Sequence, residues 1–323
     1  MTTKEKSLET EESMDLIKDP ELKKTLNGLM DAFKASGPNK EAEEFKKGII
    51  KAPIPPEQKI LAFLPHQLAK TSIFYPMSDR ELKEENRKIT RLEQETGWGN
   101  VVIEGIKLAI FEEDIFLALM KISKDKIKKV EGEYVLDINM KNIVNLLYGS
   151  AGYTKQSFAR IENTLQHFQL VRFELTTFDW KKKGKERLKT RTTRSIGNIV
   201  QSYKYDERTK DIIIKFNPEF MAYFLESMLT NINFSVRRSL KKDGSKALLR
   251  FLAAHNQPSK MHILTVLKAI NFNTDQPMFR LRSRLKEFIQ ELRKHKVLGP
   301  KTKLDKDDIV FFDVFPPKKR LTD

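Results

Sequence analysis

The segment from Thr154 to Arg194 limits the folds open to this chain more than any other. Its first half predicts a helix, because apolar residues recur there at helical spacing: Phe158, Ile161, Leu165 and Phe168. The side chains between them are polar or basic and are expected to face outward: Lys155, Gln156, Arg160, Asn163 and Gln166. From Leu170 to Thr177 bulky residues alternate with polar ones, which indicates a strand.

A strongly basic run that holds one acid, Glu186, follows this strand. Its cations are Lys181, Lys182, Lys183, Lys185, Arg187, Lys189, Arg191 and Arg194. Apolar residues typical of strands return near Ile196 and Ile212. This order predicts a winged helix, whose helix enters the major groove while its basic wing lies along the phosphates. The alternative is a surface helix packed on a sheet, with a solvated charged loop.

Another helix is predicted just before this segment. Asn139 can cap this upstream helix, and Thr154 can cap the helix of the segment itself. The residues between the two helices include Gly149 and Gly152 and are expected to form a tight turn. Helix, glycine-containing turn and helix are the order of a helix-turn-helix, which agrees with the winged-helix interpretation.

Length and charge narrow the class of protein. The 323 residues are enough for about two domains with their own cores. A net charge of +16 draws the chain to polyanions, namely DNA, RNA or an anionic membrane surface. The absence of cysteine excludes a disulfide framework and cysteine-ligated zinc, and it fits a reducing cytosol. We expect a cytoplasmic protein, because no apolar run has bilayer length and no secretion signal is visible.

Composition divides the chain into four parts. Residues 1–56 are expected to be largely disordered, with one amphipathic helix and a Pro-rich linker. Residues 57–97 are expected to form an N-terminal arm and a charged connector, and the span from Ser78 to Glu95 is expected to be a solvated helix or a disordered loop. Residues 98–216 and 217–323 are each predicted as a winged-helix domain. The predicted fold class is therefore α+β and mainly helical, with two tandem winged-helix domains.

The second domain repeats the order of the first: helices, a turn, a basic helix and strands. Its long helix is predicted from about Pro277 to His295, with an apolar inner face formed by Leu281, Leu285, Phe288 and Leu292. Basic and small polar residues occupy the rest of its first half and are the predicted DNA-binding residues of this helix: Arg280, Arg282, Ser283, Arg284 and Lys286. The two sequences do not repeat letter by letter, so the duplication is one of architecture only.

No catalytic motif stands out in the sequence. The chain contains no phosphate-binding G-x-x-x-x-G-K-[ST], no H-E-x-x-H and no G-x-S-x-G, and its five histidines are scattered. Glu112, Glu113 and Asp114 are adjacent, but acids in the first turn of a helix offset its macrodipole, and we prefer this role to a metal site. We therefore expect no enzyme, no metal site and no cofactor.

The ordered set of segments resembles the initiator proteins of iteron-type plasmid replication, of the broad-host-range kind. The segments that carry this resemblance are the arm element Thr71–Ser72–Ile73–Phe74, the strand–glycine–strand–acid–helix stretch from Val101 to Ile122, the helix-turn-helix with its basic run, and the arginine-rich helix from Phe279 to Gly299. The resemblance covers roughly Leu61 to the C-terminus.

This resemblance implies binding to direct repeats in double-stranded DNA at a replication origin. It implies that most base reading comes from the second-domain helix, with Arg280, Ser283, Arg284 and Lys286. The first-domain helix would read the neighbouring major groove about one turn away, with Lys155, Gln156, Arg160 and Asn163. The run from Lys181 to Arg194 would hold phosphates. Bound copies would promote opening of an adjacent A·T-rich region and recruit a host initiator and the replicative helicase, and the unbound protein would be a homodimer.

Three other functions remain open at this stage. A winged-helix transcription regulator or autorepressor would bind one operator, usually as a symmetric dimer, without melting DNA. An enzyme acting on nucleic acid would nick supercoiled origin DNA in the presence of Mg²⁺. The charge alone also permits a structural role or a role at a membrane surface, but paired helix-turn-helix units do not require either, and we expect no membrane partner.

Overall fold

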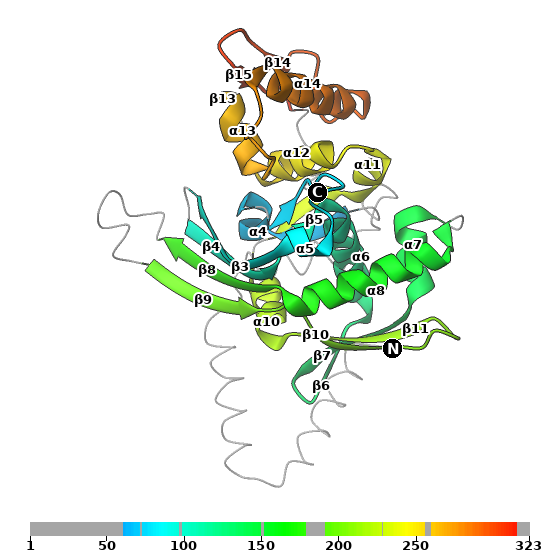
Figure 1. Cartoon of the computed structure of the whole chain (residues 1–323). Helices are drawn as coiled ribbons and strands as arrows, with labels where there is room; N and C mark the ends of the chain where they lie inside the picture. Colours follow the sequence, from blue (N-terminus) through cyan, green and yellow to red (C-terminus); the bar gives the residue numbers. More distant parts are fainter. Residues whose placement is uncertain are drawn as a thin grey trace, which may run out of the picture. The chain divides into compact units, whose positions relative to one another are not determined.

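The structure, a computed structural model, describes residues 61–71, 73–96, 99–149, 152–178, 191–227, 229–255 and 260–314 (Figure 1). The described residues belong to one compact unit, Ile60–Asp323. The predicted N-terminal helix and Pro-rich linker of residues 1–56 lie outside them. Among the described segments, no helix is both long enough and apolar enough to cross a bilayer.

An N-terminal arm is packed into the body of this unit. The arm consists of β1 (Leu61–Pro65), α4 (His66–Thr71) and β2 (Phe74–Tyr75). Strand β1 pairs antiparallel with β12 (Leu229–Asn233), and β2 pairs parallel with β5 (Leu108–Ala109). Most apolar side chains of the arm are fully buried, so the arm is part of the core.

The first large sheet has the strand order β3-β4-β8-β9. Its strands are β3 (Lys88–Thr96), β4 (Gly99–Ile106), β8 (Arg172–Phe178) and β9 (Arg191–Gly197). The expectation of a solvated helix or a disordered loop from Ser78 to Glu95 is wrong for its second half, where α5 (Glu84–Arg87) leads into β3. The sequence does not predict this strand because it is rich in charged residues. An edge strand exposes charged residues such as Arg91 and Glu93, which discourage pairing with other chains.

The predicted helix-turn-helix is present. It belongs to the series α6 (Ile110–Lys126), β6 (Lys128–Val130), β7 (Glu133–Asn139), α7 (Met140–Tyr148) and α8 (Lys155–Leu170). Both predicted caps are confirmed: Asn139 accepts a hydrogen bond from the amide of Lys141, and Thr154 accepts one from the amide of Ser157. Gly149 ends α7 with a φ of +73°, in the region that favours glycine.

The hairpin that extends the sheet of the helix-turn-helix is β10–β11. Strand β10 (Val200–Tyr205) pairs with β11 (Asp211–Phe216), and β11 pairs with β7, which gives the order β10-β11-β7-β6. We expected this position for the strands around the basic run, but they belong to the other sheet, where β8 pairs with β4 and β9 pairs with β8. Both hairpins follow α8 and both alternate in polarity, so local pattern could not show which one pairs with β7.

Helix α12 (Asp243–Ala254) joins the body to the C-terminal elements (Figure 1). It follows α10 (Pro218–Glu226) and α11 (Phe234–Ser239) and contacts α4, α6 and β12 as well as α14 (Met278–Lys294). Gly244 in its first turn lies so close to Phe288 of α14 that an added Cβ atom would come within 2.1 Å of the ring. The close approach requires glycine at this position, and it fixes α14 against α12.

The C-terminal elements repeat the order of the helix-turn-helix and its hairpin. After α12 come β13 (Lys260–His262), α13 (Ile263–Ala269), α14, β14 (Lys303–Leu304) and β15 (Ile309–Phe311). Their sheet order is β13-β15-β14, which corresponds to β7-β11-β10 in the first series. In both cases the strand before the two helices pairs with the last strand of the hairpin, so the same topology occurs twice along the described chain.

Candidate nucleic-acid interface

Helix α8 presents the polar face that the sequence predicts. Its inner face is buried through Ile161, Thr164, Leu165 and Phe168. The ring of Phe168 meets Phe116 of α6 edge-on, with centroids 6.2 Å apart, which anchors the helix on the core. The four predicted site residues of this helix are all exposed: Lys155, Gln156, Arg160 and Asn163.

Arg160 also has a structural contact. Its guanidinium carbon lies 4.0 Å from the centre of the Phe111 ring at the start of α6, a cation–π contact. Burial raises the pKa of Tyr148 on α7, and the nearby guanidinium of Arg160 partly offsets this increase. Arg160 therefore helps to position α8 against α6 and α7 while it remains exposed.

Glu112 holds the C-terminal half of α8. This fully buried carboxylate binds Arg87 of α5 and the imidazole of His167 on α8. It also accepts a hydrogen bond of 2.5 Å from the amide of Ala109 at the start of its own helix. The position of the predicted reading helix is thus set by one acid that three different elements share.

The neighbouring acids of α6 also form tertiary ion pairs, which goes beyond the dipole role expected from the sequence. Glu113 binds Arg237 of α11 and Arg250 of α12, while Asp114 binds Arg237 at 2.5 Å and Lys246 at 2.6 Å. Burial opposes the charge of Arg237, but the two carboxylates outweigh it and raise the pKa of the guanidinium. Within the described residues, no three or more His, Cys, Asp or Glu side chains are arranged to hold a metal ion.

The β10–β11 hairpin supplies basic side chains beside α8 that the sequence prediction missed. Lys204 and Arg208 are exposed on it. The Nζ atom of Lys210 lies 5.2 Å from the centre of the Phe158 ring, so the hairpin tip packs against the start of α8. The alternating strands on either side of a polar turn are a local signal for this hairpin. The run from Lys181 to Arg194 is more basic, however, and the sequence therefore predicts the wing there.

Most of the basic run predicted as a wing lies outside the described residues: Lys181, Lys182, Lys183, Lys185, Arg187 and Lys189. Arg191 is the first residue of β9. Arg194 in the same strand forms a 2.8 Å ion pair with Glu226 of α10 and lies 5.8 Å from the ring centre of Tyr223. Arg194 thus helps to pack α10, and phosphate binding by this run stays a prediction.

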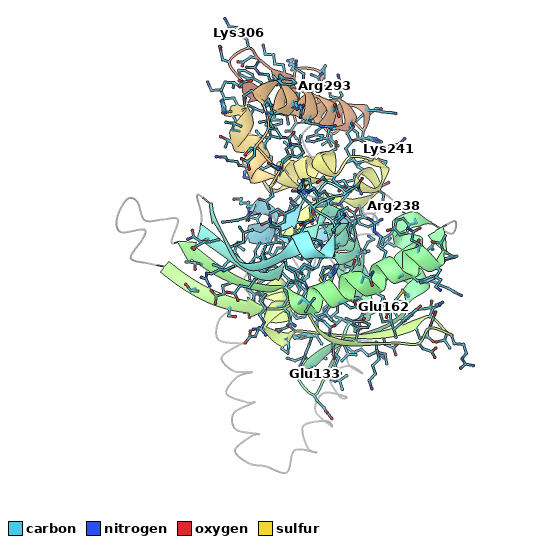
Figure 2. The ribbon with its side chains drawn as sticks, viewed as in Figure 1. Glu133, Glu162, Arg238, Lys241, Arg293 and Lys306 are labelled. Atoms are coloured by element: carbon cyan, nitrogen blue, oxygen red, sulfur yellow. The ribbon has the colours of Figure 1, made fainter. Side chains whose placement is uncertain are left out.

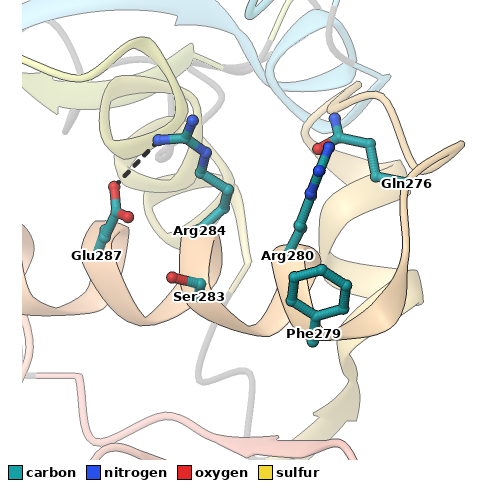
Figure 3. A pocket seen from close by; sticks show the side chains of 6 residues that line it. All are labelled: Gln276, Phe279, Arg280, Ser283, Arg284 and Glu287. Carbon is teal, nitrogen blue, oxygen red and sulfur yellow. Dashed lines mark hydrogen bonds and ion pairs between the residues drawn. The ribbon is translucent and has the colours of Figure 1, made fainter.

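Helix α14 carries the second group of predicted site residues (Figure 3). The predicted inner face is buried: Leu281, Leu285, Phe288 and Leu292. The predicted site residues are all exposed: Arg280, Arg282, Ser283, Arg284 and Lys286. Three of them line a surface pocket of about 420 Å³ together with Gln276, Phe279 and Glu287. Figure 3 shows Arg280 beside Gln276 and Arg284 beside Glu287.

Arg282 ties α14 to the hairpin that follows it. Its Nε and Nη2 atoms donate hydrogen bonds of 2.5 and 2.7 Å to the two carboxylate oxygens of Asp308, between β14 and β15. This bidentate pair lowers the pKa of Asp308. A contact between Arg282 and DNA, as predicted from the sequence, would have to share or break the pair.

Arg284 is held less firmly. Its Nη1 atom lies 3.4 Å from an oxygen of Glu287, and Nζ of Lys242 lies 2.6 Å from the same oxygen. The hydrogen bond from Lys242 is the main cause that lowers the pKa of Glu287. Because Lys242 is the closer partner, Arg284 can turn toward a base without leaving Glu287 unpaired.

Further exposed cations surround α14. Lys301, Lys303 and Lys306 belong to the β14–β15 hairpin and its approach, and none was predicted as a site residue. Figure 2 shows Lys306 at the tip of this hairpin and Lys241 close to the start of α12. The hairpin therefore carries exposed cations, as β10–β11 does, although acids such as Asp307 and Asp206 lie among the cations of both hairpins.

A comparison with protein families identifies the family of this chain. The sequence model described as "Initiator Replication protein, WH1" matches residues 77–253, more than half of the chain. The chain belongs to this family of replication initiators. The resemblance drawn from the sequence is thus confirmed for the family. The matched segment of the initiator includes α8 and β10–β11 and ends in α12, so α14 lies beyond it.

Two solved structures are similar to the initiator. Domains 2 and 3 of RctB align with a TM-score of 0.47 and 10% identity, over 79% of this chain and 99% of theirs. The Pi initiator protein, solved in complex with iteron DNA, aligns with a TM-score of 0.47 and 12% identity, over 80% of this chain and 99% of its own. No curated protein sequence matches the initiator.

Proposed function

We propose that this initiator binds directly repeated sites, iterons, at a plasmid replication origin through two winged-helix domains. The observation that carries the proposal is the repeated topology, in which α8 and α14 both expose polar and basic side chains and both precede a hairpin with exposed cations. Membership of the initiator family supports the role in replication. We assign the two domains to residues 98–216 and 217–323; within the second domain, α12 joins its C-terminal elements to the body.

The two helices would read bases in neighbouring major grooves of one duplex. Arg280 and Arg284 of α14 present guanidinium groups, which can bind the O6 and N7 atoms of guanine bidentately. Gln156 and Asn163 of α8 present amides, which suit the N6 and N7 atoms of adenine. The larger number of cations on α14 favours this helix as the main source of base contacts.

The hairpins and the basic run would bind the phosphates. Arg208 on β10–β11 and Lys303 and Lys306 on β14–β15 are exposed, and the run from Lys181 to Arg194 has the matching charge. Phosphate contacts release counterions, so binding is expected to weaken steeply as salt increases. These contacts would set the register of the protein on DNA without reading the sequence.

Binding would lead to initiation without catalysis by this chain. We infer that bound copies promote opening of an adjacent A·T-rich region and recruit a host initiator and the replicative helicase, in the bacterial cytoplasm. The unbound protein would be a homodimer. Incubation of supercoiled origin DNA with the protein and Mg²⁺ should therefore leave the DNA without nicks.

A footprint on the DNA that flanks the protein's own gene, at two salt concentrations, tests the proposal. We expect protection of several evenly spaced direct repeats beside an A·T-rich tract, with permanganate-reactive thymines in that tract. A single protected inverted repeat over a promoter would instead support a transcription regulator. Diffuse protection that disappears at higher salt would reduce the function to non-specific phosphate binding.

A further inference from the structure

Phe279, in the first turn of α14, differs in exposure from the other phenylalanines whose burial the structure describes. Its side chain is 67% exposed, whereas those others are buried or half-buried. Apart from the half-buried Met278, the other large apolar side chains of the helix, such as Leu281 and Leu285, are buried. Phe279 therefore does not contribute to the core of the C-terminal elements.

The surroundings of Phe279 are those of the proposed base-reading surface. It lines the same pocket as Arg280, Ser283 and Arg284 (Figure 3). The guanidinium carbon of Arg280 lies 5.8 Å from the centre of its ring. Phe279 and Ser283 are four residues apart on one helix, so their side chains share a face. A ligand that meets the arginines of this surface would also meet the ring.

Among the groups at the floor of the major groove, thymine alone offers an apolar one, its C5 methyl. A phenyl ring can contact this methyl group, while the guanidinium groups beside it bind polar base edges. We propose that Phe279 determines specificity by contacting the methyl group of a thymine in each repeat. This inference rests on the proposed function, because it places α14 in the major groove.

Replacement of single thymines by deoxyuridine tests this inference, because it removes only the methyl group. For the full-length protein on one repeat, we expect one position at which deoxyuridine weakens binding about fourfold, the effect of removing one buried methyl group. Phe279→Ala should weaken binding to the unmodified repeat by at least as much. The Phe279→Ala variant should bind the deoxyuridine repeat as tightly as it binds the unmodified repeat.

The matched control is Leu225→Ala on α10, since Leu225 is 60% exposed and lies on an element outside the proposed interface. This variant should keep the wild-type affinity and the full response to deoxyuridine. Equal thermal unfolding of the two variants and wild type would show that the fold is intact, as expected for exposed side chains. Phe279→Leu, which keeps an apolar group, should retain part of the deoxyuridine response.

If deoxyuridine weakens binding by Phe279→Ala as much as it weakens binding by wild type, the inference is overturned. A deoxyuridine scan without effect on affinity at any thymine would also overturn it. These results are distinct from failure of the proposed function. If wild type binds the repeat no better than a shuffled sequence, the proposed function fails. If it prefers the repeat but shows no coupling to Phe279, only the assignment of this residue fails.

Discussion

Arg250 of α12 and Glu113 of α6 form an ion pair in the interior of the protein, where both side chains are at most 1% exposed. The same arginine donates a hydrogen bond to the carbonyl oxygen of Phe74 in the arm. Because α12 also packs against α14 at Gly244, this pair connects the arm and α6 to the C-terminal elements. The position of α14, which we propose as the second reading helix, thus depends on charges at the start of α6.

Glu113→Gln should lower the free energy of unfolding by about 3–5 kcal/mol. The substitution removes one negative charge and leaves the guanidinium groups of Arg237 and Arg250 buried with less compensation. Urea unfolding of the full chain measures the change. Glu104→Gln is the control, since Glu104 pairs with Arg91 at the surface and such a pair contributes at most about 1 kcal/mol. Similar small losses for both variants would contradict the role of the buried pair.

Arg282→Ala and Asp308→Ala should weaken binding to the repeat by the same factor, about threefold to fivefold. Either substitution releases the β14–β15 hairpin from α14, because the two side chains bind each other bidentately. Titration of fluorescent repeat DNA measures both affinities. A loss for Arg282→Ala combined with unchanged or tighter binding for Asp308→Ala would show that Arg282 contacts DNA directly.

The stability of the fold should fall in mild acid. Burial is the main cause that lowers the pKa of both His66 and His255 below the ordinary value of 6.5. The unfolded chain therefore binds protons that the folded chain resists, and the free energy of unfolding decreases as the pH falls below about 6.5. Urea midpoints across this range measure the effect. In the double variant His66→Gln/His255→Gln the decrease should be smaller, and an unchanged slope would assign it to other groups.

Arg208→Ala should weaken binding to repeat and shuffled DNA by the same factor. Arg208 is exposed near the tip of β10–β11, where we expect a phosphate rather than a base. The slope of log affinity against log salt should decrease in magnitude by about one. A loss confined to the repeat sequence would show instead that the hairpin reads bases.

The helices of the proposed interface could be predicted because each carries a strong local signal. Apolar spacing and the caps Asn139 and Thr154 marked α7 and α8, and four apolar residues marked the inner face of α14. These signals depend on residues within one or two turns of each other. They therefore also placed the exposed faces of α8 and α14 correctly.

Features that depend on distant pairing could not be predicted. The charged edge strand β3 is defined by its pairing with β4, and β10–β11 is distinguished from β8–β9 only by pairing with β7. The roles of Glu113 and Arg282 depend on partners that lie 137 and 26 residues away in the sequence. No local pattern records such partners, so the acids of α6 were interpreted only as a helix start.

In the proposed complex, α8 and α14 read different parts of the same repeat. High-resolution footprints of Asn163→Ala and Arg284→Ala on one repeat test it most directly, with wild type as the reference. We predict that Arg284→Ala loses protection in one part of the repeat and Asn163→Ala in another, about one helical turn away. An even loss across the whole repeat for both variants, or no loss for Asn163→Ala, would contradict the account.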